Sequence, residues 1–125
     1  MLRPLLPLVP VVLVSSVAVA QPRTFNVPVQ RGITVNLVNN TGQAVSIEVP
    51  GRIGARTLAN RAAITLLLKS NESVLYTPTG NFLIRAAATF DPRRNTLNLV
   101  LTETRAIGQD TRSLFIDPSN KILIF

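Results

Sequence analysis

Short runs of alternating apolar and polar residues fill most of the chain, and turn-forming residues separate one run from the next. In "VNLVNNTGQAVSIEV", residues 35–49, the alternation is interrupted by Asn39-Asn40-Thr41-Gly42, and Val38 is an apolar exception on the polar face. A period of two is typical of a strand with one buried face, and Asn and Gly tolerate the positive φ of tight turns. The pattern predicts a β-hairpin over 35–49 with one buried face.

Similar runs follow, separated by Pro50-Gly51, Pro78-Thr79-Gly80-Asn81, residues 91–95 and Asp117-Pro118-Ser119-Asn120. Turn signals at this spacing are typical of a β-sandwich or small barrel. Pro28 lacks an amide donor, so its run is expected at a sheet edge. We predict an all-β fold, a small antiparallel Ig-like β-sandwich of about 7 to 9 short strands.

The segment 55–68 is the ambiguous part of the pattern. Its apolar residues fit the i, i+3, i+4, i+7 spacing of a helix, which favours a short helix within 55–68. Its neighbours are all predicted strands, and pairing with neighbours overrides local preference. Strand is therefore the favoured interpretation, with the helix as the alternative.

The first twenty residues have the order of a secretory signal. Arg3 precedes an apolar run, and Ala18-Val19-Ala20 ends it, which predicts cleavage before Gln21. The run is shorter than a membrane span and contains prolines. We expect residues 1–20 to be a cleaved Sec signal peptide and 21–125 to be a single exported domain, periplasmic or extracellular, with no transmembrane segment.

The strings "VNNTG", "EVPG", "ARTL" and "TFDPRRNTLNLVLTET", with a closing hairpin, resemble small exported β-proteins of unassigned function seen in cyanobacteria. The resemblance covers most of residues 21–125. It implies an Ig-like sandwich and carries no known active site.

The composition limits the chemistry that the chain can perform. It has no Cys and no His, so the usual zinc, copper and iron ligand sets and the Ser-His-Asp and Cys-His nucleophiles are excluded. The carboxylates of the mature chain are Glu48, Glu72, Asp91, Glu103, Asp110 and Asp117. No two of them have the spacing of a catalytic pair. We predict a protein that is not an enzyme, with no catalytic residues, no metal site and no cofactor.

The charge is the remaining functional signal. The chain has 13 Lys and Arg against 6 Asp and Glu, a net charge of +7, which falls by one when Arg3 leaves with the leader. Arginine binds carboxylate, sulfate and phosphate through a planar fork of donors. The candidate anion-binding residues are Arg52, Arg56, Arg61, Arg93 and Arg94. If their loops meet at one end of the sandwich, they would form an anion-binding rim.

An anionic polysaccharide or envelope surface is the expected partner of such a rim. Nucleic acid is an unlikely partner, because single-strand binders need aromatic stacking platforms that are scarce here. Two alternatives stay open. The charge is a solvated surface without a partner, or the chain is a structural subunit that self-associates through strand edges, with 25–29, 114–116 and 122–125 as candidate edges.

Overall fold

The computed structural model describes residues 23–26, 32–119 and 121–125. The expected signal peptide, its cleavage site and Pro28 lie outside these residues. The strands are β1 (Arg23–Asn26), β2 (Ile33–Asn40), β3 (Val45–Val49), β4 (Ile53–Leu58), β5 (Ala63–Leu68), β6 (Ser73–Pro78), β7 (Leu83–Asp91), β8 (Thr96–Thr104), β9 (Ser113–Ile116) and β10 (Lys121–Ile124). A short 3-10 helix, η3 (Ile107–Gln109), lies between β8 and β9.

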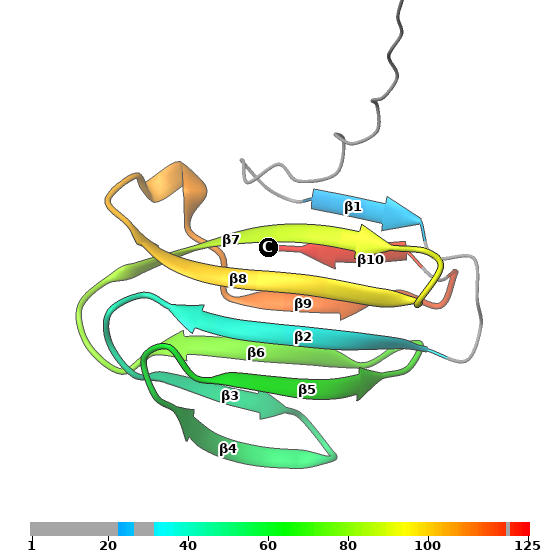
Figure 1. The fold of residues 1–125 in the computed structure, drawn as a ribbon, viewed down its shortest axis with the longest axis horizontal. Helices are drawn as coiled ribbons and strands as arrows, with labels where there is room; N and C mark the ends of the chain where they lie inside the picture. The colour runs from blue at the N-terminus through cyan, green and yellow to red at the C-terminus, as the bar shows by residue number, and fades with distance from the viewer. Residues whose placement is uncertain (1–22, 27–31, 120) are drawn as a thin grey trace, which may run out of the picture.

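These strands form two facing sheets (Figure 1). The first sheet has six strands in the order β1-β10-β9-β6-β3-β4, and the second has four in the order β5-β2-β8-β7. All neighbouring strands are antiparallel except β2 and β8, which run parallel. The two sheets confirm the predicted all-β sandwich, with a strand count slightly above the expected range.

The hairpin predicted over 35–49 is wrong in its pairing. β2 and β3 are both strands with one buried face, but β2 pairs with β5 and β8, whereas β3 pairs with β4 and β6. The connection between them is an arch from one sheet to the other. Local alternation is the same in a hairpin and in an arch, so the pattern alone did not distinguish them.

Asn39 holds this arch. Its side chain is fully buried and donates hydrogen bonds to the backbone oxygens of Gln43, at 2.8 Å, and of Leu58, at 2.9 Å. Its Oδ1 accepts hydrogen bonds from the amide and hydroxyl of Thr41, at 3.0 and 2.7 Å. One amide side chain thus ties the end of β2 to the end of β4 in the opposite sheet.

The segment 55–68 lies in two strands, β4 and β5, so the alternative of a short helix there is wrong. A turn separates them, in which Arg61 has a φ of 71° and the amide of Ala62 donates to Ala59 O at 3.0 Å. β4 pairs with β3 and β5 pairs with β2, in different sheets. Pairing with these neighbours outweighs the helical spacing of the apolar residues.

In the C-terminal half, two of the predicted turns lie between strands that pair with each other. β7 and β8 pair across the turn at 91–95, and β9 and β10 pair across the turn that begins at Asp117. β1 lies at an edge of the first sheet, as expected for the run that includes 25–29. The expectation that 114–116 and 122–125 form sheet edges is wrong, because β9 lies between β6 and β10, and β10 between β9 and β1.

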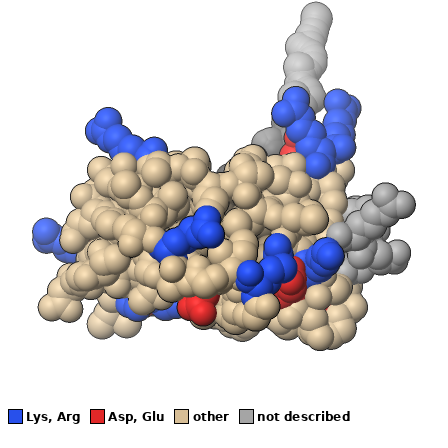
Figure 2. All heavy atoms as spheres, turned by 90° about the horizontal axis from the view of Figure 1, so that it is seen from below, with Lys and Arg blue, Asp and Glu red and all other residues tan. Residues whose placement is uncertain are grey.

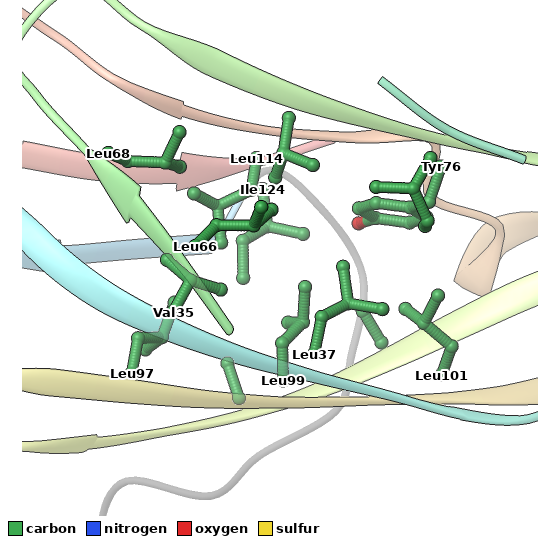
Figure 3. Close-up of a cluster of buried hydrophobic side chains, with 14 of the residues drawn as sticks. Val35, Leu37, Leu66, Leu68, Tyr76, Leu97, Leu99, Leu101, Leu114 and Ile124 are labelled. Atoms are coloured by element: carbon green, nitrogen blue, oxygen red, sulfur yellow. The ribbon is translucent and has the colours of Figure 1, made fainter. Parts of the chain in front are cut away.

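The core consists of alternate side chains from both sheets. Figure 3 shows the leucines of β8, at positions 97, 99 and 101, facing residues of the other sheet such as Leu114 and Ile124. All five of these side chains are buried. Burying a side chain of this size contributes about 1.5–3 kcal/mol, and with no cysteine in the chain the fold depends on this packing.

One hydroxyl lies within the core. Tyr76 is fully buried, and its OH donates a hydrogen bond to Thr111 Oγ1 at 2.9 Å. Burial raises the pKa of the Tyr76 hydroxyl well above its usual range. The group therefore stays neutral at physiological pH and acts as a structural hydrogen-bond donor.

Candidate anion-binding surface

The five arginines predicted to bind anions lie in three turns and one edge strand of the sandwich. Arg52 is in the turn between β3 and β4, and Arg93 and Arg94 are in the turn between β7 and β8. Arg56 lies within the edge strand β4, and Arg61 is in the turn between β4 and β5. The β4–β5 turn lies at the opposite end of the sandwich from the other two turns, so the five arginines do not form one rim.

Hydrogen bonds join the turns at the end that carries Arg93 and Arg94. Asn95 Nδ2 donates to Gly32 O at 2.6 Å, and the amide of Asn71 donates to Ile116 O at 2.6 Å. We call this end the cationic end. Among the described residues, its Lys and Arg residues are Arg52, Lys69, Arg93, Arg94 and Lys121. In Figure 2 cationic side chains stand in separate groups across the visible face and at both ends of the molecule, and some of them have carboxylates beside them.

The β7–β8 turn presents two arginines from an ordered backbone. Asp91 Oδ1 accepts a hydrogen bond from the amide of Arg93 at 3.0 Å, and Asn95 closes the turn with a φ of 51°. The nearest carboxylate oxygen, Asp91 Oδ2, is 4.0 Å from Nε of Arg94, whose side chain is 83% exposed. Both guanidinium groups are therefore available to a ligand in solution.

Arg52 has different surroundings. Its guanidinium donates to both carboxylate oxygens of Glu72, at 2.9 and 3.0 Å, and also to Leu67 O. The carboxylate of Glu72 also accepts a hydrogen bond from the backbone amide of Lys69 at 2.9 Å. Arg52 thus joins the β3–β4 turn to the β5–β6 turn, and its Nε and Nη2 already donate within the protein.

Arg56 and Arg61 are both exposed but lie apart from the cationic end. Arg56 lies opposite Ile47 on β3, next to an irregularity in the pairing of β3 and β4. The amide of Arg61 donates to Asn39 O at 2.6 Å, so its backbone belongs to the arch described above. Neither side chain forms an ion pair within the described parts of the chain.

Two residues of the cationic end were missed by the sequence analysis. Lys69 follows the end of β5, and Lys121 begins β10, so they are far apart in sequence. The signal that could have found Lys121 is that it lies beside the predicted turn 117–120, whereas no predicted turn marks Lys69. Without the sheet order, nothing in the sequence indicates that these residues share an end with 91–95.

The carboxylates near these cations are engaged as structural acceptors. The hydrogen bonds from Arg52 hold the pKa of Glu72 below its usual range. The amide of Lys121 donates to Asp117 Oδ1 at 2.9 Å, and this bond lowers the pKa of Asp117. Both carboxylates are ionised at neutral pH, and both stabilise turns.

Within residues 23–26, 32–119 and 121–125 there is no group of three or more metal-ligating side chains and no pocket. No helix in the same residues is long and apolar enough to cross a membrane. The exposed arginines of the cationic end are thus a surface for contact rather than an enclosed site.

Comparison with protein-family models, with curated proteins and with solved structures gives no match for this chain.

Proposed function

We propose that this protein is an exported, non-enzymatic binding module whose cationic end engages an anionic polysaccharide or other anionic envelope or matrix polymer. The expected signal peptide supports the exported location, and the absence of His and Cys from the sequence supports a binding role. The cationic end supplies the contact surface.

The single observation that carries the proposal is the geometry of Arg93 and Arg94. The turn fixes their backbone through Asp91, while the side chains extend from it without a close ion pair. A guanidinium in this state binds carboxylate, sulfate or phosphate bidentately without first breaking an internal contact. Exposed contacts of this kind contribute about 0.2–1 kcal/mol each, so affinity has to come from repeated contacts along a polymer.

The alternative function, self-assembly through strand edges, has less support. Three edges carry features that hinder pairing with another strand. Arg56 and a pairing irregularity lie on β4, Arg52 donates to Leu67 O on β5, and Asp110 and Thr111 use both backbone groups of Ile84 on β7. These features favour the binding module.

The test is retention of the purified protein on the host's envelope polysaccharide, from low salt to about 0.5 M, a range over which exposed charge interactions become screened. The double variant Arg93→Ser/Arg94→Ser removes the proposed contact. Its matched control, Arg61→Asn/Arg105→Ser, removes the same charge from elsewhere, and Asn tolerates the positive φ at position 61.

We expect salt-sensitive retention of the wild-type protein, a loss of about tenfold in affinity for the Arg93/Arg94 variant, and less than about twofold for the control. Equal losses in both variants would indicate attraction by net charge without a site. Absence of retention at every salt concentration would overturn the proposal.

A further inference from the structure

The outward face of the four-stranded sheet has almost no charge. At the outward positions of β5, β2, β8 and β7 the charged residues are Arg85 and Asp91, both on β7. The other outward positions hold Thr, Asn and small or aliphatic residues. In a chain of net charge +7, this face is distinct from the cationic end.

Arg85 has an unusual environment on this face. It lies opposite Thr102 on β8, which in turn lies beside Asn40 on β2. Nε of Arg85 and Oγ1 of Thr102 are both buried and have no hydrogen-bond partner among the residues that the structure describes. Within the same residues Arg85 forms no ion pair.

The two terminal nitrogens of Arg85 differ from its Nε. No described residue accepts a hydrogen bond from either of them, and unlike Nε they are not buried. Both nitrogens are therefore exposed to solvent. Because Nε is buried, this part of the side chain lies against the sheet, while the terminal nitrogens are donors without a partner among the described residues. A guanidinium binds a carboxylate or sulfate group through two such donors at once.

We propose that this face binds an acidic polysaccharide, with the guanidinium of Arg85 holding a carboxylate or sulfate group of one sugar. The amide and hydroxyl side chains along the sheet bind hydroxyl groups of neighbouring sugars. The inference rests on the proposed function for the class of polymer, but it assigns the contact to a different surface from Arg93 and Arg94.

A row of polar side chains on the same face extends the site. Thr65 Oγ1 donates to Asn36 Oδ1 at 2.9 Å, and Asn36 Nδ2 donates to Asn98 Oδ1 at 3.2 Å. Nδ2 of the exposed Asn98 is left as a donor for a ligand. Asn98 and Thr102 are four residues apart on β8, which places them about 13 Å from each other along the strand. An extended polysaccharide with one anionic group among several hydroxyl groups would contact both positions.

The composition of the face argues against other partners. A nucleic acid carries one phosphate per nucleotide and is bound by rows of cations, whereas Arg85 is the lone cation of these outward positions. The same positions hold no aromatic residue, so stacking on the apolar face of a neutral sugar is not available. A polymer with sparse anionic groups and many hydroxyls is the ligand that matches this face.

The test measures the affinity of the purified protein for polygalacturonate, dextran sulfate and neutral dextran. Arg85→Gln removes the charge, Arg85→Lys keeps the charge without the fork, and Thr102→Val removes the neighbouring hydroxyl. Arg105→Ser, in an exposed position after β8, is the matched control for net charge. The thermal midpoint of each variant is measured first, and if Arg85→Gln is unfolded, Arg85→Lys and Thr102→Val carry the test.

We expect Arg85→Gln to weaken binding of at least one anionic polymer about tenfold, Arg85→Lys and Thr102→Val to weaken it less, and Arg105→Ser to change it less than about twofold. Preference for polygalacturonate identifies the anionic group as carboxylate, and preference for dextran sulfate identifies it as sulfate.

Wild-type affinity for the anionic polymers in all Arg85 and Thr102 variants would overturn the inference. If Arg93→Ser/Arg94→Ser loses binding in that case, the proposed function stands without it. If the wild-type protein binds no anionic polymer, both fail.

Discussion

Arg52 and Glu72, twenty residues apart in the chain, form a bidentate ion pair with hydrogen bonds of 2.9 and 3.0 Å. The same guanidinium donates to Leu67 O at the edge of β5. The pair therefore links a turn of the six-stranded sheet to the edge of the four-stranded sheet. An arginine that the sequence suggested as a ligand-binding residue has a structural role.

Replacing Glu72 with Gln removes the charge of this pair and weakens its hydrogen bonds. We expect a loss of about 1 kcal/mol in the free energy of unfolding at pH 7, because the pair is bidentate but partly exposed. Urea denaturation measures it. Glu103→Gln, at an exposed position, is the matched control and should leave the free energy within about 0.3 kcal/mol of wild type.

The same pair predicts how stability depends on pH. The pKa of Glu72 is lower in the folded state than its unfolded value of about 4.3. Its contribution is therefore fully present above the unfolded pKa and is lost as the pH falls through the lowered folded pKa. The stability difference between wild type and Glu72→Gln should shrink as the pH falls from 7 to about 3. A difference that stays constant over this range would contradict the role assigned to the ion pair.

Replacing Asn39 with Ala should destabilise the arch strongly. The change leaves the amide of Thr41 and the buried Leu58 O without their side-chain partner, while the hydroxyl of Thr41 keeps its hydrogen bond to Gln43 O. Each unsatisfied buried group costs about 1–3 kcal/mol, so we expect a loss of at least about 2 kcal/mol in the free energy of unfolding. The neighbouring exposed Asn40→Ala should cost less than about 0.5 kcal/mol, and equal effects at the two positions would contradict the proposed role of the arch.

Asn39 also shows how far the sequence predicts this fold. Alternation correctly identified β2 and β3 as strands with one buried face, because burial depends on which residues face the core. It did not identify their partners, because pairing depends on contacts such as Asn39 with Leu58, which are remote in sequence. For β9 and β10, where the partner follows directly, the predicted closing hairpin and the structure agree, and β7 and β8 likewise pair across a predicted turn.

The candidate site was harder to predict for the same reason. Arg52 and Arg61 are close in sequence but lie at opposite ends of the sandwich, while Lys121 joins Arg93 at the cationic end through the sheet order. Arg85 had no sequence signal, because its properties come from the burial of Nε beside Thr102. The number of charged residues could be counted from the sequence, but their positions relative to one another in the fold could not be predicted from it.

Gly32, before β2, should not tolerate a side chain. It has a φ of 99°, and a Cβ at this position would lie 2.3 Å from Leu68 O. Both the backbone conformation and the contact with β5 oppose Gly32→Ala, and we expect a loss of at least about 2 kcal/mol in the free energy of unfolding. Gly54→Ala is the matched control, since nothing lies within 4 Å of the position that its methyl group would take, and it should change the free energy by less than about 0.5 kcal/mol. A tolerated Gly32→Ala would show that the start of β2 can move away from β5.

Arg56 should keep the edge of β4 from pairing with another molecule. β4 lies beyond β5 at one edge of the sandwich (Figure 1), and Arg56 shares a face with the buried Ile47 although its own side chain is exposed. A charge on the core-facing side of an edge strand, beside an irregularity in pairing, opposes the addition of a further strand because the charge would have to be buried. We expect Arg56→Val to self-associate at a concentration at which the wild-type protein is monomeric, as measured by sedimentation or light scattering.

Thr57→Val is the matched control for Arg56→Val, because it adds an apolar residue to the same strand on the opposite face and keeps the charge. It should remain monomeric. If Arg56→Val is also monomeric, the edge is protected by its irregular pairing alone. If the wild-type protein itself assembles, and does so equally with and without Arg93 and Arg94, the structural-subunit alternative gains over the binding module, because assembly through edges does not need those two side chains.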